Sequence, residues 1–569
     1  MRLSQAAHPR TEIQRLPGFF VAIVARYADQ MSGIALVHDP VYKRAGGPLQ
    51  LTRAAPKPSI MLSVHDHGAP PPCPAPFNLA AYVLARAAEQ PDKVALSILG
   101  FSGAARWRYG QLESAVRGTG TGLLRAGLVP GDHVLMRLGN DVEFPIAYLG
   151  AIAAGLVPVP SSAQLTAPEV RVLIDAVNPA AILHGPGIVC PQDTGTRLIG
   201  TETLLTMRDM PPVNWDMGDP DRPAYIVFTS GTAGRPRPVV HAHRAIWARR
   251  MMRDGWHAIG PGDRILHAGA FNWTYTMGTG LMDPWTWGAT ALIPAPGITP
   301  EQLPLLLARH DATIFAAAPG IYRKMLRTGT PLRLPKLRHG LSAGEKLADG
   351  IRDDWEAATG TRIHEAYGMT ECSTFISASP GHPAASGTLG RPQKGRRVAI
   401  LGSGGPVARG TQGMIAVHRG DPGLMLGYLG EPEATATRFS GDWFVTGDHG
   451  TMDDDGAITY LGREDDMMNA GGYRVSPLEV EAALARMPAI NEIAVTDVEV
   501  RPDARVIMAF YTAPEPVPPE TLDVHAATCL ARYKRPRGYV HLGALPTGAN
   551  GKIKRRALRT IYKDLHDQA

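Results

Sequence analysis

Short apolar runs alternate with amphipathic segments along the first half of this chain. Val94–Ile98 and Val134–Leu138 are mainly apolar and are bounded by turn residues, a pattern that predicts strands. Apolar positions at helical spacing predict helices from Trp107 to about Ala126 and from Glu143 to Ala154. Strands that alternate with helices favour an α/β fold with a largely parallel sheet.

The alternation continues toward the C-terminus and then changes character. Further strands are predicted at 157–160, 181–183, 225–228, 264–268 and 313–315, and further helices at 79–88, 168–176, 245–255 and 300–309. From Val398 to Leu461 the pattern is β-rich, and after Ser476 helices and strands mix again. We therefore predict an α/β fold: a large N-terminal domain of parallel-sheet α/β layers with a β-rich subdomain, followed by a small α+β C-terminal domain.

The bulk composition is that of a globular protein with more than one domain. The 569 residues are 44% hydrophobic and 19% charged, and the net charge of +6 is not gathered in a basic tail. A polyanionic small molecule explains this charge as well as nucleic acid would, and we expect no nucleic-acid partner. No apolar run approaches the roughly 20 residues that span a bilayer. The four scattered cysteines have no metal-binding spacing and indicate reduced thiols in a cytoplasmic protein.

Residues 1–60 differ from the sequence that follows. The short apolar run Phe19–Ala25 resembles a secretory signal but has no convincing cleavage site. Met61 precedes a proline-rich stretch and a well-patterned helix. Our hypothesis is that translation starts near Met61 and that residues 1–60 are an upstream misreading or a disordered extension.

One stretch has the composition of a phosphate-binding loop. The apolar run Tyr225–Phe228 ends at once in a Gly/Ser/Thr loop that leads to Arg235 and Arg237. Glycines allow backbone N–H groups to approach an anion, hydroxyls add donors, and arginines add positive charge. An ordinary turn explains such a loop equally well when it is considered alone.

Five stretches, in this order, resemble the motifs of the adenylate-forming enzymes, the family of acyl-CoA synthetases, luciferases and peptide-synthetase adenylation domains. They are TSGTAGRPR (229–237), YGMTE (367–371), WFVTGD (443–448), GREDDMMNAGGYRVSPLEVE (462–481) and PTGANGKIKR (546–555). The resemblance covers residues 75–562. It implies a large adenylating domain at 75–464 and a small, mobile C-terminal domain at 465–562.

The resemblance also implies a reaction and its substrates. In such enzymes a carboxylate attacks the α-phosphate of ATP, which gives an acyl-adenylate and pyrophosphate, and a thiol then displaces AMP. Carboxylate and triphosphate are both anions, so the site must neutralise charge and hold the two in line. ATP, Mg²⁺ and CoA are the expected cofactors and substrates.

The resemblance assigns nucleotide contacts to particular residues. Tyr367 would stack on adenine, Thr370 would contact the α-phosphate, Asp448 would accept both ribose hydroxyls, and Arg463 would lie near the ribose or phosphates. Arg463 in a surface ion pair is the alternative. The other expected ATP or AMP contacts are Thr229, Ser230, Gly231, Thr232, Gly234, Arg237, Gly344, Glu345, Lys346, Glu365, Ala366, Gly368 and Met369.

The catalytic, metal and CoA assignments follow in the same way. Glu371 would be a Mg²⁺ ligand, with a buried structural glutamate as the alternative. Lys552 would stabilise charge on the α-phosphate, unless it is a surface lysine of the basic tail. Asp465 would be the hinge. Gly471 and Gly472 would line the path of the CoA arm, and Arg474 would meet a CoA phosphate or form a structural salt bridge.

The chain departs from the family pattern at three positions. Ala233 replaces a threonine of the phosphate loop, Arg237 replaces a lysine, and Asn469 replaces a lysine near the hinge. The first two changes remove one phosphate donor and alter the geometry of one cation, so they bear on the affinity for ATP.

Few residues bear on the acid. Asn272 is neutral about where enzymes for α-amino acids carry an aspartate, and Gly368 stands where acetate-specific relatives carry a tryptophan. Trp273 and Met277 are expected walls of the acyl pocket, with core packing as the alternative. The amino-acid sequence at 281–285 and 342–345 most resembles that of medium-chain and benzoate-type acyl-CoA synthetases.

We therefore expect a ligase that joins a medium-chain or aromatic carboxylate to CoA. No carrier domain follows before Ala569, which favours CoA as the acceptor. Two alternatives stay open: a stand-alone adenylation enzyme that loads a carrier protein, and a nucleotide-binding protein without turnover. The sequence leaves the oligomeric state undecided.

Overall fold

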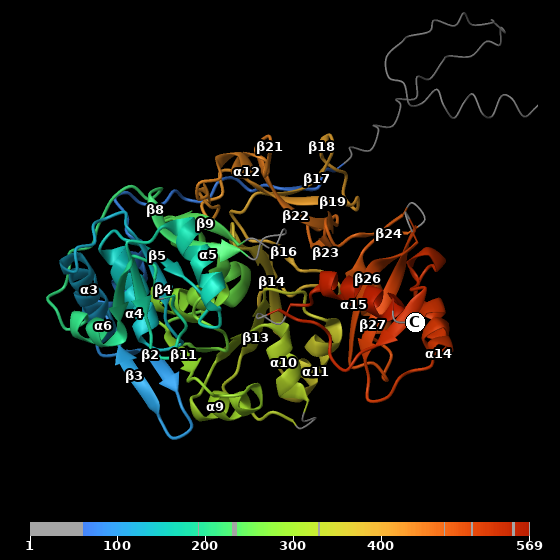
Figure 1. Cartoon of the computed structure of the whole chain (residues 1–569), viewed down its shortest axis with the longest axis horizontal. Helices are drawn as coiled ribbons and strands as arrows, with labels where there is room; N and C mark the ends of the chain where they lie inside the picture. Colours follow the sequence, from blue (N-terminus) through green and yellow to red (C-terminus); the bar gives the residue numbers. More distant parts are fainter. Residues whose placement is uncertain are drawn as a thin grey trace, which may run out of the picture. The chain divides into compact units, whose positions relative to one another are not determined.

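The computed structural model describes residues 61–191, 193–229, 236–327, 331–470, 473–501, 504–548 and 552–567 (Figure 1). The side chains of 469–474, 501, 504, 566 and 567 are not described. The expectation for residues 1–60 therefore lies outside the described residues.

The largest sheet has nine strands in the order β16-β15-β14-β13-β12-β10-β11-β2-β3. The inner strands from β14 to β2 are parallel, whereas β3, β15 and β16 pair antiparallel at the edges. Their bounds are β2 (Val94–Leu99), β3 (Ala104–Arg108), β10 (Arg264–His267), β11 (Thr290–Pro294), β12 (Ile314–Ala317), β13 (His339–Ala343), β14 (Ile363–Met369), β15 (Ser373–Ser377) and β16 (Arg391–Pro392).

A second parallel sheet has four strands in the order β5-β4-β6-β7. Its strands are β4 (His133–Arg137), β5 (Val157–Pro160), β6 (Ala181–His184) and β7 (Arg197–Gly200). Helix α4 (Glu143–Ala153) connects two of these strands, and all of its residues from Phe144 onward are buried. That burial explains why α4 has no polar face in the sequence.

The other helices of this part of the chain each precede or follow a strand of the two sheets. They are α2 (Leu79–Val83), α3 (Tyr109–Arg125), α5 (Ala167–Val177), α6 (Thr201–Met207), α7 (Ala245–Ala248), α8 (Asp283–Thr286), α9 (Leu303–Arg309), α10 (Pro319–Leu326) and α11 (Asp349–Thr359). Short 3₁₀ or π segments cover η2 (Ala85–Ala87), η3 (Arg253–His257), η4 (Thr276–Met282) and η5 (Pro300–Gln302).

Two antiparallel sheets form the β-rich part. A seven-stranded sheet contains β1 (Val64–His65), β17 (Val398–Gly402), β18 (Gly405–Pro406), β19 (Gly413–His418), β21 (Phe439–Ser440), β22 (Trp443–Met452) and β23 (Ile458–Arg463). A three-stranded sheet contains β8 (Pro223–Thr229), β9 (Arg237–Ala242) and β20 (Gly427–Tyr428). Helix α12 (Pro432–Ala436) follows β20.

The C-terminal elements, red in Figure 1, have their own hydrophobic core. They are β24 (Met468–Ala470), β25 (Tyr473–Val475), α13 (Pro477–Leu484), β26 (Glu492–Arg501), β27 (Ala504–Thr512), α14 (Pro519–Cys529), η6 (Arg532–Lys534), β28 (Gly538–His541) and α15 (Arg555–Asp567). β27 pairs antiparallel with β26 and parallel with β28. This is an α+β arrangement.

The predicted fold class is confirmed, with two local corrections. Trp107 and Arg108 belong to edge strand β3, where the cross-strand pair Leu96–Trp107 holds them, and α3 begins only at Tyr109. The helix expected over 245–255 is shorter, because α7 ends at Ala248 and a turn and a π segment follow.

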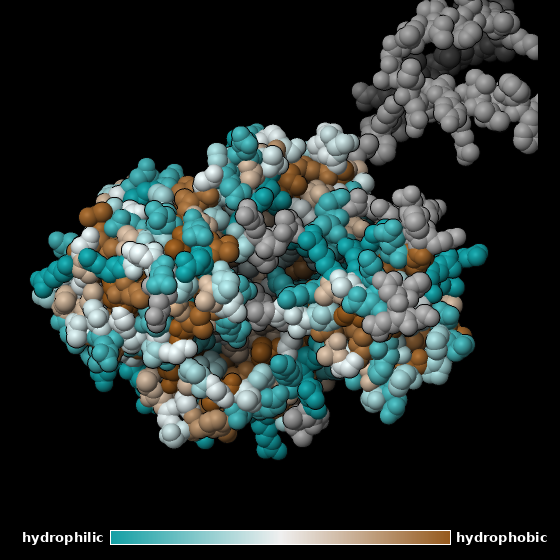
Figure 2. Space-filling view, in the orientation of Figure 1, coloured by the Kyte–Doolittle hydropathy of each residue, from teal (hydrophilic) through white to brown (hydrophobic). Residues whose placement is uncertain are grey.

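None of the helices within the described residues is long and apolar enough to cross a membrane. On the face drawn in Figure 2, hydrophobic residues are scattered in small groups among hydrophilic ones, as is usual for surfaces in contact with water.

Candidate active site

The expected phosphate loop connects two antiparallel strands. Thr229 at the end of β8 pairs with Arg237 at the start of β9, so the loop is the tip of a hairpin. Ser230, Gly231, Thr232, Ala233 and Gly234 lie outside the described residues.

The side chain of Arg237, at the start of β9, is held by an acid and an aromatic ring. Arg237 Nε lies 3.3 Å from Glu431 Oε2, and its guanidinium lies 5.3 Å from the centroid of the Tyr428 ring. Because Tyr428 is on β20, which pairs with β9, the pairing of these two strands brings the three side chains together.

Tyr428 also contacts the expected metal ligand. Glu371 is 8% exposed, and the Tyr428 hydroxyl donates a 2.8 Å hydrogen bond to Glu371 Oε1. No described residue donates a hydrogen bond to Glu371 Oε2. A carboxylate with one fixed and one available oxygen fits a Mg²⁺ ion that completes its shell with phosphate and water oxygens. The described residues contain no cluster of three or more ligand side chains, and such an ion needs none.

Asp448 is a buried carboxylate held by two tyrosines. The Tyr367 hydroxyl donates to Asp448 Oδ2 at 2.6 Å, and the Tyr460 hydroxyl donates to Oδ1 at 3.3 Å. Burial raises the pKa of Asp448, although Tyr367 and Arg463 oppose this shift. A carboxylate has about four acceptor positions, so two remain for the hydroxyls of a ligand.

The residues that follow β13, Lys346 and Leu347 among them, are held by a buried carboxylate. The buried Glu365 carboxylate accepts from Lys346 Nζ at 3.1 Å, from Arg352 Nη2 at 3.2 Å and from the Leu347 backbone N–H at 2.8 Å. Glu365 and Lys346 thus pair with each other. Burial raises the pKa of Glu345, and Lys552 is the strongest opposing charge.

Lys552 lies close to these acids although it is far from them in sequence. Backbone hydrogen bonds from Gly548 N–H to Lys552 O (2.7 Å) and from Lys554 N–H to Pro546 O (2.8 Å) fix the base of its loop. The side chain keeps an exposed surface, yet the surrounding protein desolvates its ammonium group and lowers its pKa. Glu345 and Asp448 oppose that shift, which places both carboxylates within electrostatic reach of the ammonium.

The expected hinge residue is paired with its neighbour. Arg463 Nε donates to Asp465 Oδ1 at 2.9 Å, and both side chains are about half exposed. Burial alone would lower the pKa of Arg463, but Asp465 and Asp448 outweigh it and raise this pKa. Gly471 and Gly472 lie outside the described residues, as does the side chain of Arg474.

Two glycines of the nucleotide motifs allow close approaches. A Cβ on Gly368 would lie 2.1 Å from the carbonyl oxygen of Ser373, so no side chain fits there without a backbone shift. Gly344 has φ +95°, and a Cβ there would lie 2.6 Å from the Trp273 ring. Trp273 therefore packs over Gly344, and Met369 and Ala366 lie on the same strand as Gly368.

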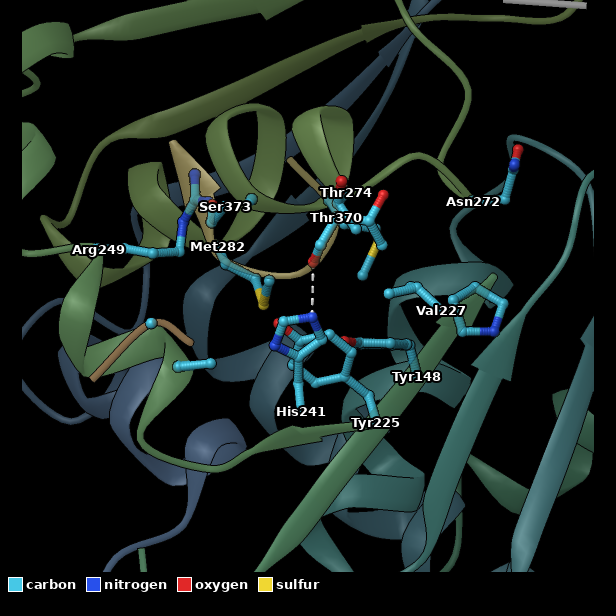
Figure 3. Close-up of a pocket in the computed structure, with 15 residues that line it drawn as sticks. Tyr148, Tyr225, Val227, His241, Arg249, Asn272, Thr274, Met282, Thr370 and Ser373 are labelled. Carbon is cyan, nitrogen blue, oxygen red and sulfur yellow. Dashed lines mark hydrogen bonds between the residues drawn. The ribbon is translucent and has the colours of Figure 1, made fainter. Parts of the chain in front are cut away.

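A pocket lies beside Thr370 (Figure 3). The space within it that the centre of a water molecule can reach is about 30 Å³, so an acid needs side chains to move aside. Met277 and Asn272 line it, as does Thr370, whereas Trp273 and Gly368 do not. The pocket is also lined by Tyr148, Tyr225, His241, Arg249 and Ser373.

A buried ion pair forms part of the pocket wall. Arg249 donates to Asp283 Oδ1 at 2.7 Å and to Oδ2 at 2.5 Å, and also to Thr279 and Ser373. Burial alone would lower the pKa of Arg249, but Asp283 raises it, so the pair is charged. The positive charge of Arg249 is therefore already neutralised.

Three residues of this site were missed in the sequence. Tyr428 and Tyr460 hold Glu371 and Asp448, and the buried His241 Nε2 donates to the Thr370 carbonyl oxygen at 2.8 Å. Only His241 left a trace in the sequence, because it is a polar residue that follows the apolar run Pro238–Val240 in the same strand.

The chain is similar to proteins of one family along most of its length. The family described as "AMP-binding enzyme" matches residues 83–429, and "AMP-binding enzyme C-terminal domain" matches residues 479–552. Benzoate–CoA ligase of Thauera aromatica is 30% identical over 539 residues, 88% of this chain and 99% of that protein. The mitochondrial acyl-coenzyme A synthetase ACSM2 of Rattus norvegicus is 29% identical over 525 residues, 85% of this chain and 92% of that protein.

A solved structure agrees with the sequence relatives. The crystal structure of a benzoate CoA ligase from Burkholderia xenovorans LB400 aligns with a TM-score of 0.76 and 28% identity. The alignment covers 85% of this chain and 100% of that chain.

Proposed function

We propose that this chain, which belongs to the AMP-binding enzyme family and is an ATP-dependent acid–thiol ligase, joins an aromatic or medium-chain carboxylic acid to CoA. The reaction class follows from the family: the acid and ATP give an acyl-adenylate and pyrophosphate, and CoA then displaces AMP. The acid class rests on the names of the relatives, which act on benzoate or are acyl-coenzyme A synthetases. A carrier-loading enzyme and a non-catalytic nucleotide-binding protein are not favoured by these relatives.

The observation that carries the proposal is the approach of Lys552 to Asp448 and Glu345. Lys552 comes from the C-terminal tail, yet it interacts electrostatically with Asp448 on β22 and with Glu345, which follows β13. An ammonium group beside the ribose-binding carboxylate is well placed for the α-phosphate, where negative charge grows as the acyl–oxygen–phosphorus bond forms.

The remaining roles are assigned to the same residues as in the sequence. Tyr367 and Asp448 hold adenosine, Thr370 and Arg237 face the phosphates, and Asp465 is the hinge about which the C-terminal part moves between the two half-reactions. Mg²⁺, held by Glu371, would neutralise phosphate charge and orient the triphosphate. All four cysteines are free, which supports our assignment of the protein to the cytoplasm.

The test is a product assay with the purified chain. ATP, Mg²⁺, CoA and a panel of benzoates and C4–C12 fatty acids are supplied, and pyrophosphate and acyl-CoA are measured. We expect both products with at least one acid of the panel. Pyrophosphate without consumption of CoA would favour a carrier protein as the acceptor, and silence across the panel would contradict the proposal.

Glu371→Gln tests the metal assignment. Since an amide is a much weaker ligand for a hard cation, the Mg²⁺ concentration for half-maximal adenylation should rise by about tenfold or more. Calorimetry should show a similar loss of affinity for ATP measured with Mg²⁺ present. Glu433→Gln, on the exposed surface of α12, is the matched control and should leave both values unchanged. An unaltered Mg²⁺ dependence in Glu371→Gln would assign the glutamate to structure alone.

A further inference from the structure

His241 presents an unused hydrogen-bond acceptor within the pocket wall. Its Nε2 must carry the proton, because the Thr370 carbonyl oxygen 2.8 Å away only accepts hydrogen bonds (Figure 3). In the neutral ring Nδ1 is then an acceptor, and it has no hydrogen-bond partner among the described residues although His241 is only 2% exposed. Such a buried group is ordinarily satisfied by protein, water or a ligand.

The surroundings keep His241 neutral and hold its ring in place. Burial lowers the pKa of His241 to about 4, so the ring is uncharged at neutral pH. The Tyr225 ring stacks on it, with centroids 4.9 Å apart and an interplanar angle of 16°. The ring of His241, which lines the pocket, therefore has a fixed orientation, and so does the lone pair of Nδ1.

The other polar side chains of the wall carry no available charge among the described residues. The hydroxyls of Tyr148 and Tyr225 make no hydrogen bond with any described residue, and burial raises the pKa of Tyr225 to about 12, so it stays protonated. Arg249 is neutralised by Asp283. An anionic group on the ligand would meet the lone pair of His241 and no unpaired cation among the described residues of the wall, whereas a neutral N–H or O–H group could donate a hydrogen bond to Nδ1.

We infer that the acid carries a hydroxyl or amino substituent that donates a hydrogen bond to His241 Nδ1, so that His241 is a specificity-determining residue of the acyl pocket. This inference rests on the proposed function, because it assumes that the pocket beside Thr370 takes the acid. An acid without the donor would leave Nδ1 buried and unsatisfied, and sites built to bond a hydroxyl discriminate strongly against its absence. A second carboxylate on the acid is excluded by the same arrangement.

The first arm of the test uses the unaltered protein. The 2-, 3- and 4-isomers of hydroxybenzoate and aminobenzoate are compared with benzoate and with the matched methoxybenzoates, and kcat/KM is measured by release of pyrophosphate. For at least one isomer we expect kcat/KM to exceed that of benzoate and of its methyl ether by about tenfold or more. The hydroxy and amino series show which donor is preferred. Equal values for benzoate and all substituted acids would overturn the inference but leave the proposed function standing, whereas inactivity with every acid would remove both.

The second arm uses His241→Phe, which keeps a flat ring for stacking and removes both nitrogens. Loss of the bond to Thr370 slows all acids alike and cancels in the ratio of the preferred acid to benzoate. That ratio should fall by about tenfold or more, to near one. His339→Phe is the matched control, because His339 is equally buried, donates to a backbone carbonyl and lies outside the pocket. A ratio unchanged in His241→Phe would overturn the inference. If the variant does not fold, the comparison of hydroxy and methoxy acids in the first arm decides.

Discussion

Replacing Lys552 with alanine is expected to slow acyl-adenylate formation by about 10²–10³-fold, since a single preorganised donor to developing charge has an effect of this size. Transfer of the acyl group from supplied acyl-adenylate to CoA should survive, because the α-phosphate charge no longer grows in that step. Exchange of pyrophosphate into ATP measures the first half-reaction. Thioester formation from synthetic acyl-adenylate measures the second.

The neighbouring Lys554 provides the control for this experiment. It is exposed on the same tail, so Lys554→Ala should leave both rates within about twofold of the unaltered protein. Equal loss of both half-reactions in Lys552→Ala would refute the assignment, because it would point to a general structural defect. Normal adenylation would do so as well.

Replacing Asp283 with asparagine is expected to lower the free energy of unfolding by about 3–5 kcal/mol, because it leaves the Arg249 guanidinium charged and unpaired in the interior. The two side chains are only 9% and 3% exposed, so water cannot substitute for the lost partner. Urea unfolding followed by tryptophan fluorescence measures the change, since Trp285 is buried on the same helix. Replacing Arg249 with methionine in the same variant should restore part of the loss.

An exposed pair provides the comparison. Arg362 and Glu356 are 59% and 47% exposed, and Glu356→Gln should cost less than about 1 kcal/mol. The buried pair also predicts that stability depends on pH. Arg249 lowers the pKa of Asp283 below its ordinary 3.8, against the effect of burial. The ionised Asp283 therefore stabilises the folded protein above pH 3.8, and this stabilisation is lost as the pH falls through the pKa of the folded state. A stability of Asp283→Asn equal to that of Glu356→Gln would contradict this account.

The spacing of apolar residues along the chain was enough to predict most of the strands and helices. Strands such as Val94–Leu99 and helices such as Ala167–Val177 lie within one or two residues of their predicted bounds, because each is fixed by local burial. Trp107 was assigned to a helix because its aromatic ring fits either period. Trp107 belongs to a strand because it pairs with Leu96 on the neighbouring strand, and this pairing cannot be read from the local sequence.

The site was predictable only as far as its residues form local motifs. The contiguous stretch 367–371 and Asp448 could be identified from the sequence motifs in which they lie. Their roles in binding and catalysis remain predictions. Tyr428 could not, because it reaches Glu371 through the pairing of β20 with β9, nearly 190 positions earlier in the chain. Long-range strand pairing of this kind leaves no periodic trace in one sequence.

The hairpin between β8 and β9 has a consequence for how the triphosphate is neutralised. In many nucleotide-binding folds the phosphate loop leads directly into a helix, whose N-terminal dipole contributes about half a positive charge. Here the loop leads into a strand, and α7 begins only at Ala245. Under the proposed function, charge compensation would therefore fall to side chains and metal, and half-exposed Arg237 shares its charge with Glu431. Nucleotide affinity in this chain should consequently depend steeply on ionic strength, which screens side chains more than a fixed backbone dipole.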